Sequence, residues 1–148
     1  MNARSHPLHK RAAISAAAGA LSLATVVATG SSAHAATSWS ATGTQADVVG
    51  AYAYGTIDNT NTHTIVRVVI RDSVSDGASA RVYFRWRYGE GSTSGAYTLT
   101  ASGYMAENSK TYSIERGRLD SWDPFEVMEC KVDNGEEVDC GGWDTPFQ

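Results

Sequence analysis

The chain has 148 residues, with 16 acidic residues against 12 lysines and arginines, and it contains two cysteines. This length suits one domain preceded by a targeting segment. The acidic balance argues against non-specific binding to nucleic acid, because affinity for polyphosphate comes mostly from neutralising its charge. We therefore expect a single domain with no nucleic-acid partner.

Residues 1–35 have the organisation of a signal peptide. A basic start is followed by an apolar stretch over residues 12–28, and Ala33-His34-Ala35 supplies the small residues that signal peptidase requires. Cleavage after Ala35 would leave 113 residues and a net charge of −7, because three basic residues and no acid precede the cut. No later stretch reaches the roughly 18–20 apolar residues that cross a bilayer. We predict a secreted, extracellular protein with no membrane contact after cleavage.

Residues 36–46 are small and polar, which predicts a flexible N-terminal arm ahead of a β-domain at residues 47–148. The two-residue period of a strand begins at residues 48–57, where Tyr52 and Tyr54 share one face. Residues 58–61 have the composition of a loop.

The clearest strand patterns lie at residues 65–72 and 80–88, with a turn at Asp76-Gly77 between them. The apolar positions alternate with arginines and one tyrosine. One side carries Val66, Val68, Ile70, Val82, Phe84 and Trp86, and the other carries Arg67, Arg71, Arg81, Tyr83, Arg85 and Arg87. If the apolar sides are buried together, the arginines should gather on the outer side of one sheet.

Further strands are expected at residues 97–104 and 110–115, and a hairpin at 125–140. A turn at residues 134–136 would place three pairs opposite one another. These pairs are Val132 with Val138, Lys131 with Asp139, and Cys130 with Cys140. In an exported protein the last pair predicts a disulfide. The tail, residues 141–148, contains Trp143 and Phe147, which we expect to dock on the domain.

About seven short strands and no long amphipathic helix predict an all-β fold. We expect a single antiparallel β-sandwich, immunoglobulin-like, with one disulfide in its C-terminal hairpin; a small barrel is the alternative.

Catalytic and metal-binding motifs are missing from this pattern. After signal cleavage the only histidine is His63, and no nucleophile signature accompanies it. One histidine and two paired cysteines cannot supply four zinc ligands, and the acids near the last hairpin match no calcium-loop spacing. We expect a protein that is not an enzyme and that uses no cofactor or metal.

The residue pattern favours a binding function over a catalytic one. The arginine and tyrosine face, together with Trp39 of the arm, is a candidate surface for an acidic secreted protein or an anionic glycan, since Arg and Tyr often anchor interfaces. The alternative is that acids of the C-terminal hairpin neutralise these arginines within the protein. Exposed aromatic rings such as Trp122 and Trp143 leave a carbohydrate-binding or cell-wall-binding module as a second possibility.

Two resemblances accompany these patterns. Trp86-Arg87-Tyr88 is similar to the Trp-Arg-Tyr triplet of small secreted α-amylase inhibitors of the tendamistat type, although both cysteines here lie downstream of it. The organisation, with a signal, a polar arm at residues 36–46 and one β-rich domain, resembles the small adaptor subunits of bacterial umbrella toxin particles. That resemblance implies a role in joining a lectin-bearing subunit to a stalk, and thus a function in interbacterial competition.

Overall fold

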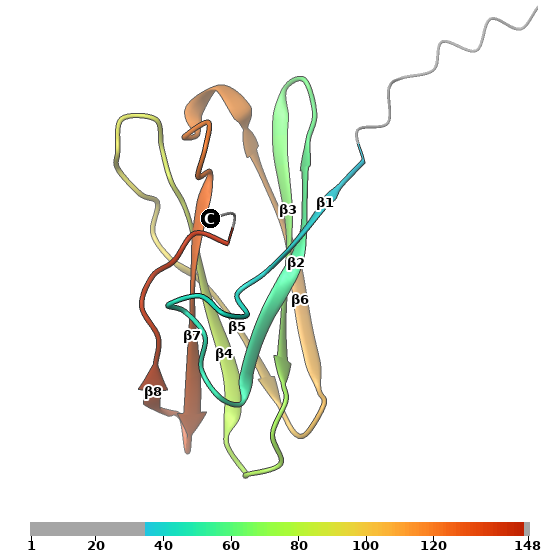
Figure 1. The fold of residues 1–148 in the computed structure, drawn as a ribbon, viewed down its shortest axis with the longest axis vertical. Helices are drawn as coiled ribbons and strands as arrows, with labels where there is room; N and C mark the ends of the chain where they lie inside the picture. Colours follow the sequence, from blue (N-terminus) through green and yellow to red (C-terminus); the bar gives the residue numbers. More distant parts are fainter. Residues whose placement is uncertain (1–34, 147–148) are drawn as a thin grey trace, which may run out of the picture. The chain divides into compact units, whose positions relative to one another are not determined.

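The computed structural model describes residues 35–146, and these residues form two antiparallel sheets of four strands each. Figure 1 shows the sheets as two layers. The first sheet, in spatial order, contains β1 (Thr37–Ser40), β2 (Ala51–Asn59), β3 (His63–Asp72) and β6 (Glu107–Glu115). The second contains β5 (Tyr97–Ser102), β4 (Ser79–Trp86), β7 (Phe125–Asp133) and β8 (Glu136–Cys140). A 3₁₀ turn, η1 (Arg116–Arg118), follows β6. The predicted all-β sandwich is confirmed. The predicted cleavage site after Ala35 depends on residues 1–34, which lie outside the described part, as does Phe147.

The core lies between the two sheets. The alternation predicted for β3 and β4 is confirmed, because all six of the apolar side chains named above are at most 2% exposed. Phe84 stacks on Tyr112 of the opposite sheet, with ring centroids 4.9 Å apart. Burial of each large side chain contributes about 1.5–3 kcal/mol, so this shared interior is the main source of stability.

The arginines do not share one face, and this part of the prediction is wrong. β3 pairs with β2 and β6, whereas β4 pairs with β5 and β7. The segment 73–78 carries the chain from one sheet to the other (Figure 1). The apolar sides of β3 and β4 therefore meet across the interior, and their polar sides point outward from opposite layers.

The segment predicted as a flexible arm is part of the first sheet. Strand β1 pairs with β2, and Trp39 is the register partner of Gly55. The Trp39 side chain is only 5% exposed and packs edge-on against Phe125 of the second sheet, with ring centroids 5.2 Å apart. Ala41 and Ala46 are fully buried. The arm prediction for residues 36–46 is therefore wrong, because one tryptophan and two alanines join the core.

A buried carboxyl joins the two layers. Glu129 of β7 has no exposed surface, and its two oxygens accept hydrogen bonds from the backbone N–H groups of Val48 and Ala53. Burial raises the pKa of Glu129 to about 8, while the two N–H donors act in the opposite direction. This side chain fixes the loop between β1 and β2 against the second sheet.

The last hairpin contains the predicted disulfide. Cys130 and Cys140 are register partners and are bonded, and Lys131 lies opposite Asp139 as expected. The predicted apolar pair is wrong, because Val132 lies opposite Glu137 and Val138 is 57% exposed. The chain turns at two residues, Asn134 and Gly135, which both have positive φ. A bulge between Lys131 and Val132 then restores the register at the cysteines.

Candidate functional site

The outer face of the second sheet, formed by β4, β7 and the C-terminal segment, is neutralised within the protein. Arg81 forms an ion pair with Glu137 at 3.0 Å. Arg85 and Arg87 share Glu126, at 2.6 and 3.2 Å. The alternative considered from the sequence, internal neutralisation, therefore holds for these three predicted site residues.

The same face is also partly covered by the C-terminal segment. The guanidinium carbon of Arg85 lies 3.8 Å from the centre of a Trp143 ring, a cation–π contact. Tyr83 lies near the same indole, at 6.5 Å between ring centroids, and its hydroxyl donates to Glu137. That hydrogen bond, and then Arg81, lowers the pKa of Glu137. Docking of Trp143 is confirmed, and it leaves Tyr83 and Arg85 in contact with partners of their own chain.

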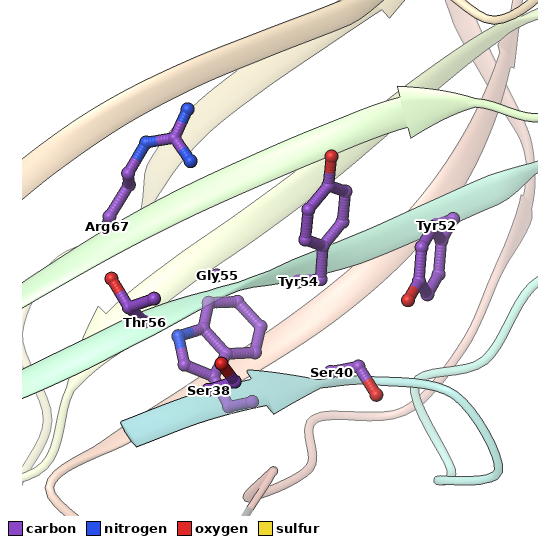
Figure 2. A pocket seen from close by; sticks show the side chains of 8 residues that line it. Ser38, Ser40, Tyr52, Tyr54, Gly55, Thr56 and Arg67 are labelled. Carbon is purple, nitrogen blue, oxygen red and sulfur yellow. The ribbon is translucent and has the colours of Figure 1, made fainter. Parts of the chain in front are cut away.

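The outer face of the first sheet carries an open groove of about 470 Å³. Figure 2 shows Tyr52 and Tyr54 beside each other along β2, with Arg67 rising from β3 beyond Gly55 and Thr56. The lining comes from three neighbouring strands. It consists of Ser38, Trp39 and Ser40 of β1, Tyr52, Tyr54, Gly55 and Thr56 of β2, and Arg67 of β3.

Gly55 allows the sheet to form beneath this groove. A Cβ atom at this position would collide with the carbonyl oxygen of Arg67 and would lie 3.1 Å from the Trp39 ring. The indole thus occupies the space beside a glycine on the neighbouring strand, an arrangement that compensates for the missing side chain. Trp39 supports the groove from within the core, and its indole N–H has no hydrogen-bond partner among residues 35–146. The expectation that its ring is exposed is wrong, although the residue lines the groove.

Arg67 is the single charged residue in the groove lining. It has no acidic partner within salt-bridge distance in the described chain, and its closest hydrogen bond, to the Ser109 hydroxyl, is 3.4 Å long. Because the lining contains no carboxylate, its local charge is positive on a protein whose net charge is negative. The groove therefore favours a ligand that carries an anionic group.

A network beside Arg67 holds one tyrosine in place. Arg71 pairs with Glu107, and the Tyr54 hydroxyl donates to the same carboxylate at 2.6 Å. The hydrogen bond to Glu107 raises the pKa of Tyr54, and the same bond, followed by Arg71, lowers the pKa of Glu107. The Arg71 guanidinium also lies over the Tyr52 and Tyr54 rings, at 5.9 and 5.3 Å. The two rings stack with centroids 4.9 Å apart, so the network fixes a rigid aromatic wall.

Of the predicted site residues, Arg67 and Trp39 line the groove, and Arg71 braces its wall. Sequence reasoning missed the roles of Ser38, Ser40 and Thr56. A signal for β2 was present, since Tyr52 and Tyr54 were expected on one face. For β1 the signal is Trp39 between two serines, which is the alternation of a strand. The segment of four residues is too short for this alternation to predict a strand.

Other candidates lie outside this groove. Trp86 is 2% exposed and Arg87 is ion-paired, so the Trp-Arg-Tyr triplet is not presented as an inhibitory tip. Trp122 is 85% exposed on the loop before β7, where the Asp120 carboxylate accepts hydrogen bonds from the loop backbone. Within the described residues, the one cluster with metal-ligand spacing is Cys130, Glu137 and Cys140, and its two sulfurs are consumed by the disulfide.

No helix in the described part is both long and apolar enough to span a bilayer. Comparison of the chain with protein-family models, with curated proteins and with solved structures finds no match.

Proposed function

We propose that this chain is a secreted, non-catalytic module that binds another extracellular protein through the groove of its first sheet. The observation that carries the proposal is the unpaired guanidinium of Arg67 in a lining without a carboxylate. Arg and Tyr supply much of the binding energy at protein interfaces when they are held on a rigid surface. Both residue types are present in this groove, on hydrogen-bonded strands.

A protein ligand suits the form of the groove. The groove is open and borders β1, which is the edge of its sheet, so a partner can approach over a wide angle. An adaptor that joins subunits of an extracellular antibacterial toxin complex is one role that would use such a surface. This role draws on the organisation noted in the sequence, and it predicts that the partners include a lectin-bearing or a stalk subunit.

Chemical cross-linking in culture supernatant, followed by mass spectrometry, tests the proposal. The wild-type domain should capture a specific protein, and Arg67→Glu should weaken that capture by roughly 30-fold, which corresponds to a loss of about 2 kcal/mol at an interface anchor. Arg116→Glu is the matched control, because Arg116 is also exposed and lies outside the groove. Equal loss in both variants, or no captured protein, would refute the proposal.

A carbohydrate ligand is the second candidate, supported by the two stacked tyrosine rings among serine and threonine hydroxyls. An acidic sugar could place its ring against a tyrosine and its carboxylate near Arg67. A glycan array distinguishes the candidates. Binding that is lost in Tyr52→Ala, and kept in Tyr104→Ala at a 64% exposed ring outside the groove, would favour the carbohydrate.

A further inference from the structure

Strand β1 presents unpaired backbone groups beside the groove. The N–H of Ala41 donates to Ala53 of β2, at 2.9 Å. Since hydrogen-bonded and non-hydrogen-bonded pairs alternate along an antiparallel ladder, Trp39 faces β2 with its backbone groups, and Ser38 and Ser40 face away. No described strand pairs with that side of β1. The edge therefore offers two N–H donors and two carbonyl acceptors at the spacing of a β-ladder.

The other edge strands are protected against such pairing. Natural sheets commonly guard their edges with charged side chains, and both β6 and β8 carry several. On β6 these are Glu107, Lys110 and Glu115, and on β8 they are Glu136, Glu137 and Asp139. On β5 the carbonyl of Thr100 is already occupied by the side-chain amide of Asn108, at 2.9 Å. Strand β1 has no charged residue and is the least protected edge of the four.

The edge and the groove lie on adjacent parts of one surface. The side chains of Ser38 and Ser40 line the groove while their backbone groups face the open edge. Both side chains are small, so they leave room above β1 for side chains from an added strand. Those side chains would lie over the serine hydroxyl groups and beside the tyrosine rings, in a groove whose single charged lining residue is Arg67.

We infer that β1 accepts an extended, acidic segment of the partner protein as a fifth strand of the first sheet. Backbone hydrogen bonds to Ser38 and Ser40 supply affinity in this recognition mode, and alternate side chains of the added strand supply specificity. Acidic residues at these alternate positions are favoured by the positive charge that Arg67, on β3, gives to the groove. The inference rests on the proposed function and deepens it by naming the chemistry and conformation of the partner segment.

A peptide titration followed by amide NMR tests the inference. The probe is a short capped peptide that alternates glutamate with threonine, and its counterpart carries lysine in place of glutamate. The acidic peptide should shift the amide signals of Ser38 and Ser40, slow their hydrogen exchange and bind at least roughly tenfold more tightly than the lysine peptide. Failure of the acidic peptide to bind, equal affinity for both peptides, or protection of β5 in place of β1 would overturn the inference.

Proline variants isolate the backbone contribution. Ser38→Pro removes an outward N–H without removing a hydrogen bond to β2, so the edge strand should still form. Binding of the acidic peptide should fall by roughly tenfold or more, whereas Ser38→Ala, which keeps the backbone N–H and removes one hydroxyl of the groove, should lose clearly less affinity. Ser40→Pro provides a second test if Ser38→Pro proves unstable by circular dichroism. Unchanged affinity in a folded proline variant would overturn the inference.

The cross-linking experiment separates this inference from the proposed function. If the partner is captured through Arg67 and capture persists in Ser38→Pro and Ser40→Pro, strand addition is wrong and the binding function stands. If no partner is captured by the wild type, the proposed function itself fails.

Discussion

The outer faces of the two sheets both carry arginines, but these arginines differ in whether an acidic partner of the same chain neutralises them. The second sheet presents Arg81, Arg85 and Arg87, and each is paired with a glutamate; Trp143 lies over Arg85 as well. The first sheet presents Arg67, which has no acidic partner in the described chain, beside a groove of about 470 Å³. The difference teaches that strand alternation tells which side chains point outward, whereas availability for a ligand depends on partners that arrive from distant parts of the chain.

The largest effect on stability is expected at Glu129. Its contacts with Val48 and Ala53 hold the segment that follows β1 against the second sheet. Its pKa is raised from 4.5 to about 8 by burial. The folded protein therefore keeps a proton that the unfolded chain releases, so the contribution of Glu129 to stability is complete below pH 4.5 and is lost as the pH rises through about 8. The loss should be on the order of 5 kcal/mol, since each pKa unit corresponds to about 1.4 kcal/mol.

Urea denaturation across this pH range measures the effect of Glu129. In Glu129→Gln the decline with pH should disappear. Glu107 and Glu137 do not interfere, because their lowered pKa values place their titration below 4.5. Parallel declines in the wild type and the variant would contradict the role of Glu129.

The second-largest effect on stability is expected within the first sheet, where β2 and β3 approach closely at Gly55. Gly55→Ala should destabilise the protein by about 3 kcal/mol, because the new Cβ meets the Arg67 carbonyl and the sheet must open locally. Gly95→Ala is the matched control, since nothing lies within 4 Å of its Cβ and its φ is not positive. Equal unfolding midpoints for the two variants would show that β2 and β3 do not approach as described.

Removing the Trp143 indole should expose Arg85 on the outer face of the second sheet and should also reduce stability. Trp143→Ala should cost about 1–2 kcal/mol, because a half-buried aromatic ring and its cation–π contact with Arg85 are lost. Trp122→Ala, at a ring that is 85% exposed, should change stability by less than about 0.5 kcal/mol. Thermal unfolding ranks the two variants, and the reverse order would refute the docking of Trp143.

The smallest effect on stability is expected at Arg67. Arg67→Ala should change the free energy of unfolding by less than about 0.5 kcal/mol, since an exposed side chain without an ion pair contributes little. Capture of the partner should nevertheless be lost. A clear loss of stability, measured by denaturant titration, would mean that Arg67 serves the fold and is not free for a ligand.

Much of the fold could be predicted from the sequence because local patterns determine it. The alternation at Val66, Val68 and Ile70 fixes which side of β3 is buried, and the spacing of Cys130 and Cys140 fixes the disulfide. Which sheet each strand joins could not be predicted, because a period of two specifies a face and not a neighbour. For that reason β3 and β4 were expected to present one arginine surface.

The candidate site was harder to predict for the same reason. The groove depends on β1, a strand of four residues whose only strong signal is Trp39 between two serines. The polar composition of the segment resembles that of a free arm, and its burial is decided by Gly55 on another strand. The bulge beside Val132 likewise has two causes, the two-residue Asn134-Gly135 turn and the pairing of the cysteines. Neither feature of the sequence predicts the bulge without the other.

Hydrogen exchange of the wild-type domain, with and without its cross-linked partner, tests the central claim most directly. We predict slower exchange at Ser38, Ser40 and the groove strand β2 in the complex, and unchanged exchange at Tyr83 and Arg85. Protection confined to Tyr83 and Arg85, with Ser38 and Ser40 unaffected, would contradict the assignment of the first sheet as the binding face.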